Sequence, residues 1–212
     1  MIVAMILTVA SFKGGVGKST TAVHLAAYFA GKAKTVLVDG DPNKSSSSWA
    51  RKGQLSFQVV GEHQAALYAR ECEHLIIDTK ARPETEDLKA LALGCHLLVL
   101  PCTPDPLSLE ALMLTISALK SLGSDRYRIL LTIVPPHPIP EGENARKAIV
   151  DAGLPIFEGE IRRIIAFQRA VLEGVTVDKI RDERAVLGWN DYKGIGKEIE
   201  RLNVQTVKRA NA

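Results

Sequence analysis

The sequence lacks the features that mark secreted and membrane-spanning proteins. It contains only three cysteines, none of them in a Cys-x-x-Cys pair, and an odd number is a poor basis for a disulfide framework. A reducing, cytoplasmic location is therefore expected. The apolar run at the N-terminus ends near Ala10, well short of the ~20 residues that a membrane-spanning helix needs. It also lacks the basic segment and cleavage signal of a signal peptide, so we interpret it as a buried strand.

Neither sign of charge dominates the chain. It has 27 basic and 24 acidic residues, a net charge of +3, and so small an excess does not by itself indicate a nucleic-acid partner. No internal repeat or low-complexity tract is present, since the serine run at 45–48 has only four residues. The composition, with 46% hydrophobic and 24% charged residues, is ordinary for a globular protein. The length fits one α/β domain, and we expect a single domain over residues 1–212.

Short apolar runs alternate with segments of helical period, which predicts a mainly parallel twisted sheet flanked by helices. Strands are expected at 5–11, 34–39, 57–60, 74–78, 96–100 and 128–134, with a shorter one near 156–161. Helices are expected at 18–31, 84–93, 107–122, 143–152, 164–173 and 190–208. We interpret the proline-rich stretch 135–140 as a long surface loop, although a domain linker is the alternative.

A glycine-rich loop joins the first predicted strand to the first predicted helix, as a phosphate-binding loop requires. Its glycines let successive backbone N–H groups point at one anion, and the helix N-terminus adds a partial positive charge. In this P-loop, Lys18 is expected to reach the β- and γ-phosphates and Ser19 to bind Mg²⁺. The cofactors predicted are therefore ATP and Mg²⁺. The predicted nucleotide-binding residues are Lys13, Gly14, Gly15, Val16, Gly17, Lys18, Ser19 and Thr20.

This loop departs from the plain P-loop pattern, because Phe12 stands at the first glycine position and a second lysine, Lys13, follows it. In this it resembles the deviant Walker A loop of the ParA/MinD family of dimerising P-loop ATPases. The resemblance implies that Lys13 crosses the interface of an ATP-bound homodimer and contacts the partner's nucleotide. Lys13 would then act as an arginine finger does, by stabilising charge that develops at the γ-phosphate.

Three aspartates follow predicted strands at the edge where open α/β sheets bind ligands. Asp39 and Asp41 end the second strand in Asp-Gly-Asp-Pro, which resembles a family stretch. The resemblance implies that Asp41 places the attacking water and contacts Mg²⁺ through water, whereas Asp39 braces the loop or caps a turn. Asp78 ends the run Leu75-Ile76-Ile77 in the shape of a Walker B strand. The catalytic residues expected are thus Lys13, Lys18 and Asp41, and the metal residues are Ser19, Asp41 and Asp78.

Three further segments bear less specific resemblance or carry weaker signals: the one after Asp78, the segment 101–107 and the region of the adenine pocket. Where the family often continues the Walker B aspartate with a pair of prolines, this chain has Thr79-Lys80-Ala81, which puts the local switch mechanism in question. The segment 101–107 resembles the family's loop beside the dimer interface. We expect the adenine pocket between the loop end at 132–136 and the turn at 160–162.

Two basic clusters are candidates for non-specific DNA binding. The last predicted helix carries four cations at spacings that place them on one face, and a second cluster has no acidic residue from 161 to 172. The candidate residues are Lys193, Lys197, Arg201 and Lys208, and Arg162, Arg163 and Arg169. A face that is merely solvated is the alternative. No membrane partner is expected, because residues 203–212 offer only two valines as apolar anchors.

The family resemblance implies a dimerising switch ATPase that associates with the nucleoid and positions a cargo, with an adaptor protein that stimulates slow hydrolysis. The cargo would be a plasmid, a chromosome region or a protein assembly, and carboxysome positioners of the McdA type are similar in overall pattern. We expect the short ParA type, without an operator-binding helix-turn-helix domain. The main alternative is an amide synthetase of the dethiobiotin or cobyrinic acid type, which would require a small acid substrate. A nitrogenase-reductase-like electron carrier is not favoured, because it would need cysteines that bridge a cluster between subunits, whereas Cys95 and Cys102 flank one predicted strand without a neighbouring glycine-rich segment.

Overall fold

The computed structural model describes residues 5–53, 55–82 and 85–210, except for the side chains of residue 85 and residues 204–210. In this part of the chain, six strands form one sheet in the order β3-β2-β4-β1-β5-β6, and every strand pair is parallel. The strands are β1 (Met5–Ser11), β2 (Thr35–Gly40), β3 (Gln58–Gly61), β4 (His74–Ala81), β5 (Leu97–Cys102) and β6 (Tyr127–Leu131). The predicted fold class is confirmed.

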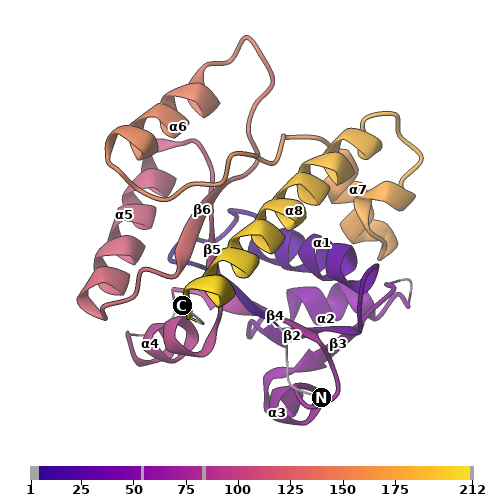
Figure 1. The fold of residues 1–212 in the computed structure, drawn as a ribbon. Coiled ribbons are helices and arrows are strands. Elements are labelled where there is room, and N and C mark those ends of the chain that lie inside the picture. Colours follow the sequence, from indigo (N-terminus) through magenta and orange to yellow (C-terminus); the bar gives the residue numbers. More distant parts are fainter. Residues whose placement is uncertain (1–4, 54, 83–84, 211–212) are drawn as a thin grey trace.

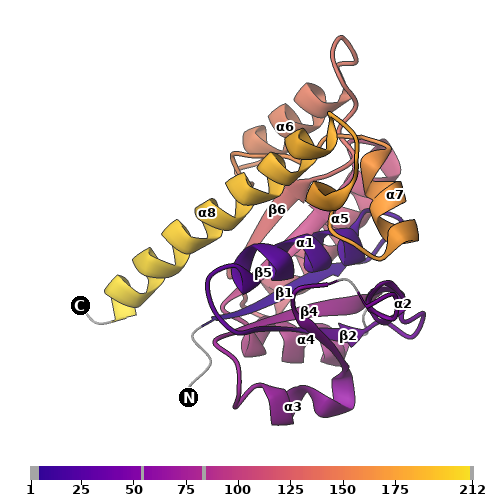
Figure 2. The same ribbon diagram turned by 90° about the vertical axis from the view of Figure 1, so that its right-hand side faces the viewer.

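Helices cover both faces of the sheet (Figures 1 and 2). They are α1 (Lys18–Ala30), α2 (Ser45–Ala50), α3 (Ala65–Tyr68), α4 (Thr85–Gly94), α5 (Pro106–Ser121), α6 (Glu141–Asp151), α7 (Ala166–Glu173) and α8 (Ala185–Ala210). Two short 3-10 turns, η1 (Glu62–Gln64) and η2 (Val177–Lys179), complete the elements. Because both faces are covered, the strands are apolar along almost their whole length.

Two large clusters of apolar side chains fix the helix layers. On one face, α1, α7 and α8 pack on the sheet with Leu7, Leu25, Ile76, Ala170 and Ile195 among the buried residues. On the other face, α4, α5 and α6 pack on it with Leu88, Leu98, Ile116, Ile129 and Ile149. The three cysteines are buried and free, as expected for thiols that serve as small apolar residues.

The sheet brings the predicted site residues to one edge. Strand β1, which leads into the P-loop, lies between β4 and β5. Asp78 of β4 is in register with Val9 of β1 and with Asp39 of β2. The P-loop and the aspartates therefore meet at the carboxyl ends of adjacent parallel strands, where such sheets bind ligands.

Several elements differ from the prediction. The strand expected near 156–161 is absent: this segment runs beside β6 and the residues after it, with isolated parallel bridges of Ile156 to Ile129 and of Arg162 to Val134. Ile133, with φ of 54°, interrupts the extended backbone after β6, so the two segments do not form a continuous ladder. The last helix begins at Ala185 rather than near 190. The short helix α2 was not predicted.

Candidate nucleotide and metal site

The P-loop has the backbone conformation that only glycine adopts readily. Gly15 and Gly17 have φ of 77° and 81°, in the left-handed region that side chains disfavour. Helix α1 begins directly afterwards, at Lys18. The Thr132 hydroxyl donates to the Val16 carbonyl over 2.9 Å, which ties the loop to the chain after β6. Glycines in this conformation directly before a helix N-terminus are typical of a phosphate-binding loop.

Lys18 lies between the loop and the aspartates. It is only 6% exposed, and its Nζ donates to the Lys13 carbonyl over 3.3 Å. Burial lowers the pKa of Lys18, while the negative charges of Asp78 and Asp41 oppose that shift. The Lys18 ammonium is thus buried beside the P-loop, which is the position that the predicted phosphate role requires.

Asp39 and Asp41 take different positions after β2. Asp39 is fully buried, and it accepts from the Asp41 N–H over 3.1 Å and from the Ser47 N–H over 2.7 Å. It thus braces the turn and caps the start of α2, which accounts for both sequence interpretations. Asp41 accepts from the Asn43 N–H over 2.9 Å and lines the cleft that contains the P-loop.

Asp78 fits the predicted metal role. Its Oδ2 accepts from the Ser46 hydroxyl over 2.7 Å, whereas its buried Oδ1 has no hydrogen-bond partner among the described residues. Burial raises the pKa of Asp78 to about 6, against the effect of the neighbouring Ser46 and Ser19 hydroxyls. A buried, unsatisfied carboxylate oxygen beside a serine hydroxyl is an incomplete set of oxygen ligands of the kind that Mg²⁺ binds. The residues present therefore fit this ion.

Two neighbouring cavities lie at the P-loop and are candidates for the nucleotide site. A cleft of about 430 Å³ is lined by the P-loop together with Asp41 and Asn43. A smaller pocket of about 160 Å³ has apolar walls that include Ile161, Ile164 and Phe167. Both are lined by Gly17 and Thr20. The segments at 132–133 and 161–163 meet at the smaller pocket, which is where the adenine was expected.

A buried histidine packs directly behind this smaller pocket. His24 of α1 stacks on Tyr192, with ring centroids 4.8 Å apart, and Tyr192 lines the pocket. The Val177 N–H donates to His24 Nε2 over 3.0 Å, so Nε2 is an acceptor and Nδ1 carries the proton that faces the Thr20 carbonyl. A second proton on Nε2 would break the Val177 bond. Accordingly, burial lowers the pKa of His24 to about 4.

We expect His24 to make stability pH-dependent. Between about pH 6.5 and about pH 4 the unfolded chain binds a proton that the folded chain excludes, so stability falls as pH falls through this window. The loss in the free energy of unfolding approaches about 3 kcal/mol at the acid end of this pH window. Urea unfolding at several pH values measures it, and His24→Gln should remove this part of the loss. Equal pH dependence in both proteins, or an NMR titration of the wild-type ring near its ordinary pKa, would contradict the prediction.

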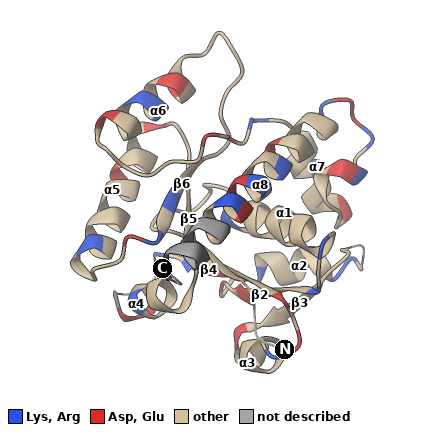
Figure 3. Ribbon diagram, in the orientation of Figure 1, with Lys and Arg blue, Asp and Glu red and all other residues tan. Residues whose placement is uncertain are grey.

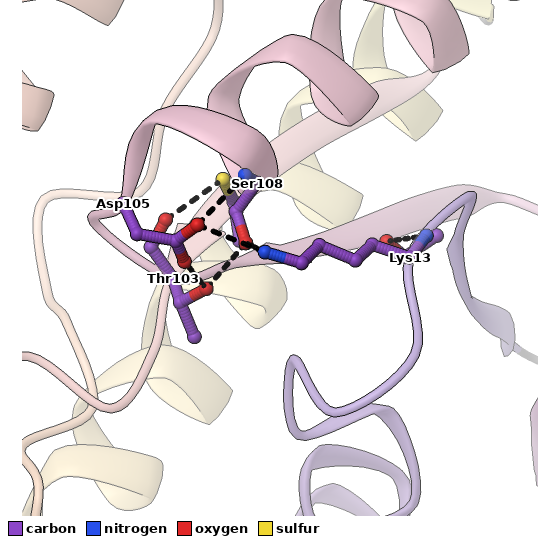
Figure 4. A network of polar contacts seen from close by, with 6 residues as sticks. Lys13, Thr103, Asp105 and Ser108 are labelled. Atoms are coloured by element: carbon purple, nitrogen blue, oxygen red, sulfur yellow. Dashed lines mark hydrogen bonds and ion pairs between the residues drawn. The ribbon is translucent and has the colours of Figure 1, made fainter.

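Lys13 does not point into its own P-loop. Its Nζ lies 2.8 Å from Asp105 Oδ1 and 2.8 Å from Ser108 Oγ at the start of α5 (Figure 4). Thr103 bonds to both of these side chains. Burial alone would raise the pKa of Asp105, but hydrogen bonds from Lys13, Thr103 and Ser108 lower it far below its ordinary value. The segment 101–107, singled out in the sequence, thus holds the second lysine.

The two basic clusters differ in how many of their positive charges are paired with acidic side chains. In the second cluster, Arg162 pairs with Asp191 through both Nε and a terminal nitrogen, and Arg169 pairs with Asp182 at 2.9 Å. Acidic residues that are distant in the sequence therefore neutralise two of the three arginines in this cluster. Only Arg163 has no ion pair among the described residues.

The basic side chains on α8 are less neutralised by ion pairs than those of the second cluster. Lys197 and Arg201 are exposed and Lys193 is partly exposed, all on one side of the helix, as the spacing predicted. Figure 3 shows blue segments along α8. Arg201 lies 3.4 Å from Glu158, whereas Lys193 and Lys197 have no ion pair in the described part of the chain. The side chain of Lys208 lies outside the described residues. No described helix is long and apolar enough to cross a membrane.

Comparisons with known proteins agree with this geometry. A family model described as the CobQ/CobB/MinD/ParA nucleotide binding domain matches residues 7–177. A maintenance of carboxysome distribution protein A from Gloeobacter kilaueensis is 35% identical, over 92% of this chain and 94% of that protein.

Two solved structures share the fold at low sequence identity. An ATP complex of a Cyanothece McdA variant superposes with a TM-score of 0.73 and 15% identity, over 95% of this chain and 96% of that one. The septum site-determining protein MinD from Pyrococcus horikoshii, in complex with Mg-ADP, gives a TM-score of 0.71 and 18% identity, over 93% and 96% of the two chains.

Proposed function

Because the chain belongs to the CobQ/CobB/MinD/ParA nucleotide-binding family and is an ATPase that uses ATP and Mg²⁺, we propose that it positions an intracellular cargo. ATP binding drives it to dimerise, and the dimer binds DNA without sequence preference. The observation that carries this proposal is the placement of Lys13. Its Nζ bonds to Asp105 and Ser108 at the start of α5 rather than to its own P-loop, a position from which it could reach a partner's nucleotide.

The proposed chemistry is in-line attack of water on the γ-phosphate. Asp41, which lines the P-loop cleft, orients the water, and Lys18 stabilises the charge that develops in the transition state. Lys13 of the second copy adds a further positive charge. Ser19 and Asp78, together with Asp41 through water, would hold Mg²⁺, which neutralises phosphate charge when bound. The smaller pocket, with Phe167 in its wall, receives the adenine.

The cargo that we propose is a protein assembly of the carboxysome kind. The relative from Gloeobacter kilaueensis carries that function in its name and matches this chain over nearly its full length. A plasmid or chromosome region is the other cargo that this family suggests. An adaptor protein on the cargo would stimulate hydrolysis and so release the ATPase from the nucleoid. The amide synthetase alternative is not favoured, because the relative that is 35% identical over 92% of this chain is a carboxysome distribution protein.

Random-sequence double-stranded DNA tests the proposed surface. We expect binding with ATP, weak binding with ADP or without nucleotide, and affinity that falls steeply with salt. Each phosphate contact contributes about 0.9 to the slope of log K against log salt, so neutralising Lys193 and Lys197 in both copies should reduce the slope by up to about 3.6. The double variant Lys193→Gln/Lys197→Gln measures this in the ATP state.

Lys89→Gln is the matched control, because Lys89 is an exposed lysine on α4, in the helix layer on the other face of the sheet. It should leave the slope unchanged. Arg162→Gln should also change it little, since Asp191 already neutralises that charge. Absence of DNA binding in every nucleotide state would refute the DNA part of the proposal. Turnover that requires a small acid substrate would instead favour an amide synthetase.

A further inference from the structure

Ser46 is a buried side chain that the chemistry above does not use. It lies in the first turn of α2, and its residue surface is fully buried. Its hydroxyl donates to Asp78 Oδ2 over 2.7 Å, and an ionised carboxylate can only accept in this bond. The remaining oxygen, Oδ1, is the buried one without a partner among the described residues. One oxygen of Asp78 is thus held by Ser46, while the other has no hydrogen bond among the described residues.

Helix α2 presents Ser46 from a fixed position. At its start, the Ser47 N–H donates to Asp39 Oδ2 over 2.7 Å. At its end, the indole N–H of Trp49 donates to the Val175 carbonyl over 2.9 Å, and Trp49 is only 3% exposed. Just beyond the helix, Lys52 Nζ donates to the Val171 carbonyl over 2.8 Å. Contacts at both ends therefore limit the movement of α2 relative to Asp78.

We propose that Ser46 is a positioning residue for Mg²⁺, which orients Asp78 so that Oδ1 faces the ion. The inference rests on the proposed assignment of Asp78 to the metal. Partners of a metal-binding carboxylate commonly change metal affinity by about 10- to 100-fold when they are removed. Ser46 does not line the cleft or the smaller pocket, so its loss should spare the nucleotide's own contacts.

The test compares the dissociation constant of fluorescent mant-ADP in excess Mg²⁺ with that in EDTA. The ratio of the two constants measures how strongly Mg²⁺ and nucleotide support each other's binding. For Ser46→Ala we expect the constant in EDTA to stay within about twofold of wild type, and the ratio to fall by about tenfold. Ser46→Cys keeps a weaker donor of similar size, so its ratio should lie between those of wild type and Ser46→Ala.

Ser48→Ala is the matched control, because it removes the same group from an exposed position on the same helix. It should behave as wild type. A Ser46→Ala protein that loses affinity equally in Mg²⁺ and in EDTA would show a structural role and overturn the inference. Asp78→Asn separates the two hypotheses. If Asp78→Asn keeps the wild-type ratio of the two dissociation constants, the assignment of Asp78 to the metal is wrong. If the ratio falls in Asp78→Asn but not in Ser46→Ala, only the role of Ser46 is wrong.

Discussion

We expect the Asp41→Ala variant to bind ATP normally and to hydrolyse it at least about a hundredfold more slowly, the loss typical of a group that handles the reacting water. The reason is its position: Asp41 lines the P-loop cleft, whereas the neighbouring Asp39 is committed to backbone N–H groups. If hydrolysis resets the dimer, the variant should also accumulate as an ATP-bound dimer. Single-turnover hydrolysis and size-exclusion chromatography with ATP measure the two effects.

Asp41→Asn is the decisive companion. An asparagine oxygen can still accept from the Asn43 N–H, as Asp41 does over 2.9 Å, so the turn should persist without the negative charge. Loss of turnover in both variants supports a role on the water. If Asp41→Asn turns over at the wild-type rate and Asp41→Ala does not, Asp41 only shapes the turn. Rapid turnover in both variants would refute the assigned role altogether.

The parts of the fold that were predicted correctly share one property, which is that their sequence pattern is local. The β1 run, the glycines and the start of α1 follow one another along the chain, and each step has its own physical signature. Helix α2 has none, because serine is a modest helix former and the run 45–48 carries no apolar period. Its stability comes from distant contacts, namely those of Ser47 with Asp39 and of Trp49 with Val175.

The same distinction separates what could be foreseen of the site. Gly15, Lys18 and Asp78 were identified because their residue types and spacing match the chemistry of phosphate and Mg²⁺. Ser46 was missed, since its bond to Asp78 joins residues 32 positions apart. The free charge of the second basic cluster was overestimated for the same reason. Arg162 is neutralised by Asp191 across a separation of 29 residues, which no inspection of the stretch 161–172 could show.

The Lys13→Ala variant should retain ATP binding but form no stable ATP-dependent dimers, and its turnover should fall by about a thousandfold or more, as when an arginine finger is lost. In the structure Lys13 Nζ is held by Asp105 and Ser108 of its own chain, so we expect ATP binding in cis not to depend on it. The Lys13 side chain is 30% exposed and can exchange these partners for a second copy's phosphates. Nucleotide titration and light scattering with ATP measure the two properties.

Removal of Lys13 also removes an ion pair, so a structural loss must be separated from a lost contact across the interface. Asp105→Ala does this, because it breaks the same pair at 2.8 Å and leaves the lysine in place. A partly exposed pair of this kind contributes roughly 0–1 kcal/mol to stability, and the cap that Asp105 gives the Ser108 N–H at the start of α5 contributes about 1 kcal/mol more, so the variant should fold. Since it frees Lys13 from its cis partner, its ATP-dependent dimers should be at least as stable as those of wild type. Normal dimers in Lys13→Ala, or equal loss of dimers in Asp105→Ala, would show that Lys13 does not act on the partner's nucleotide.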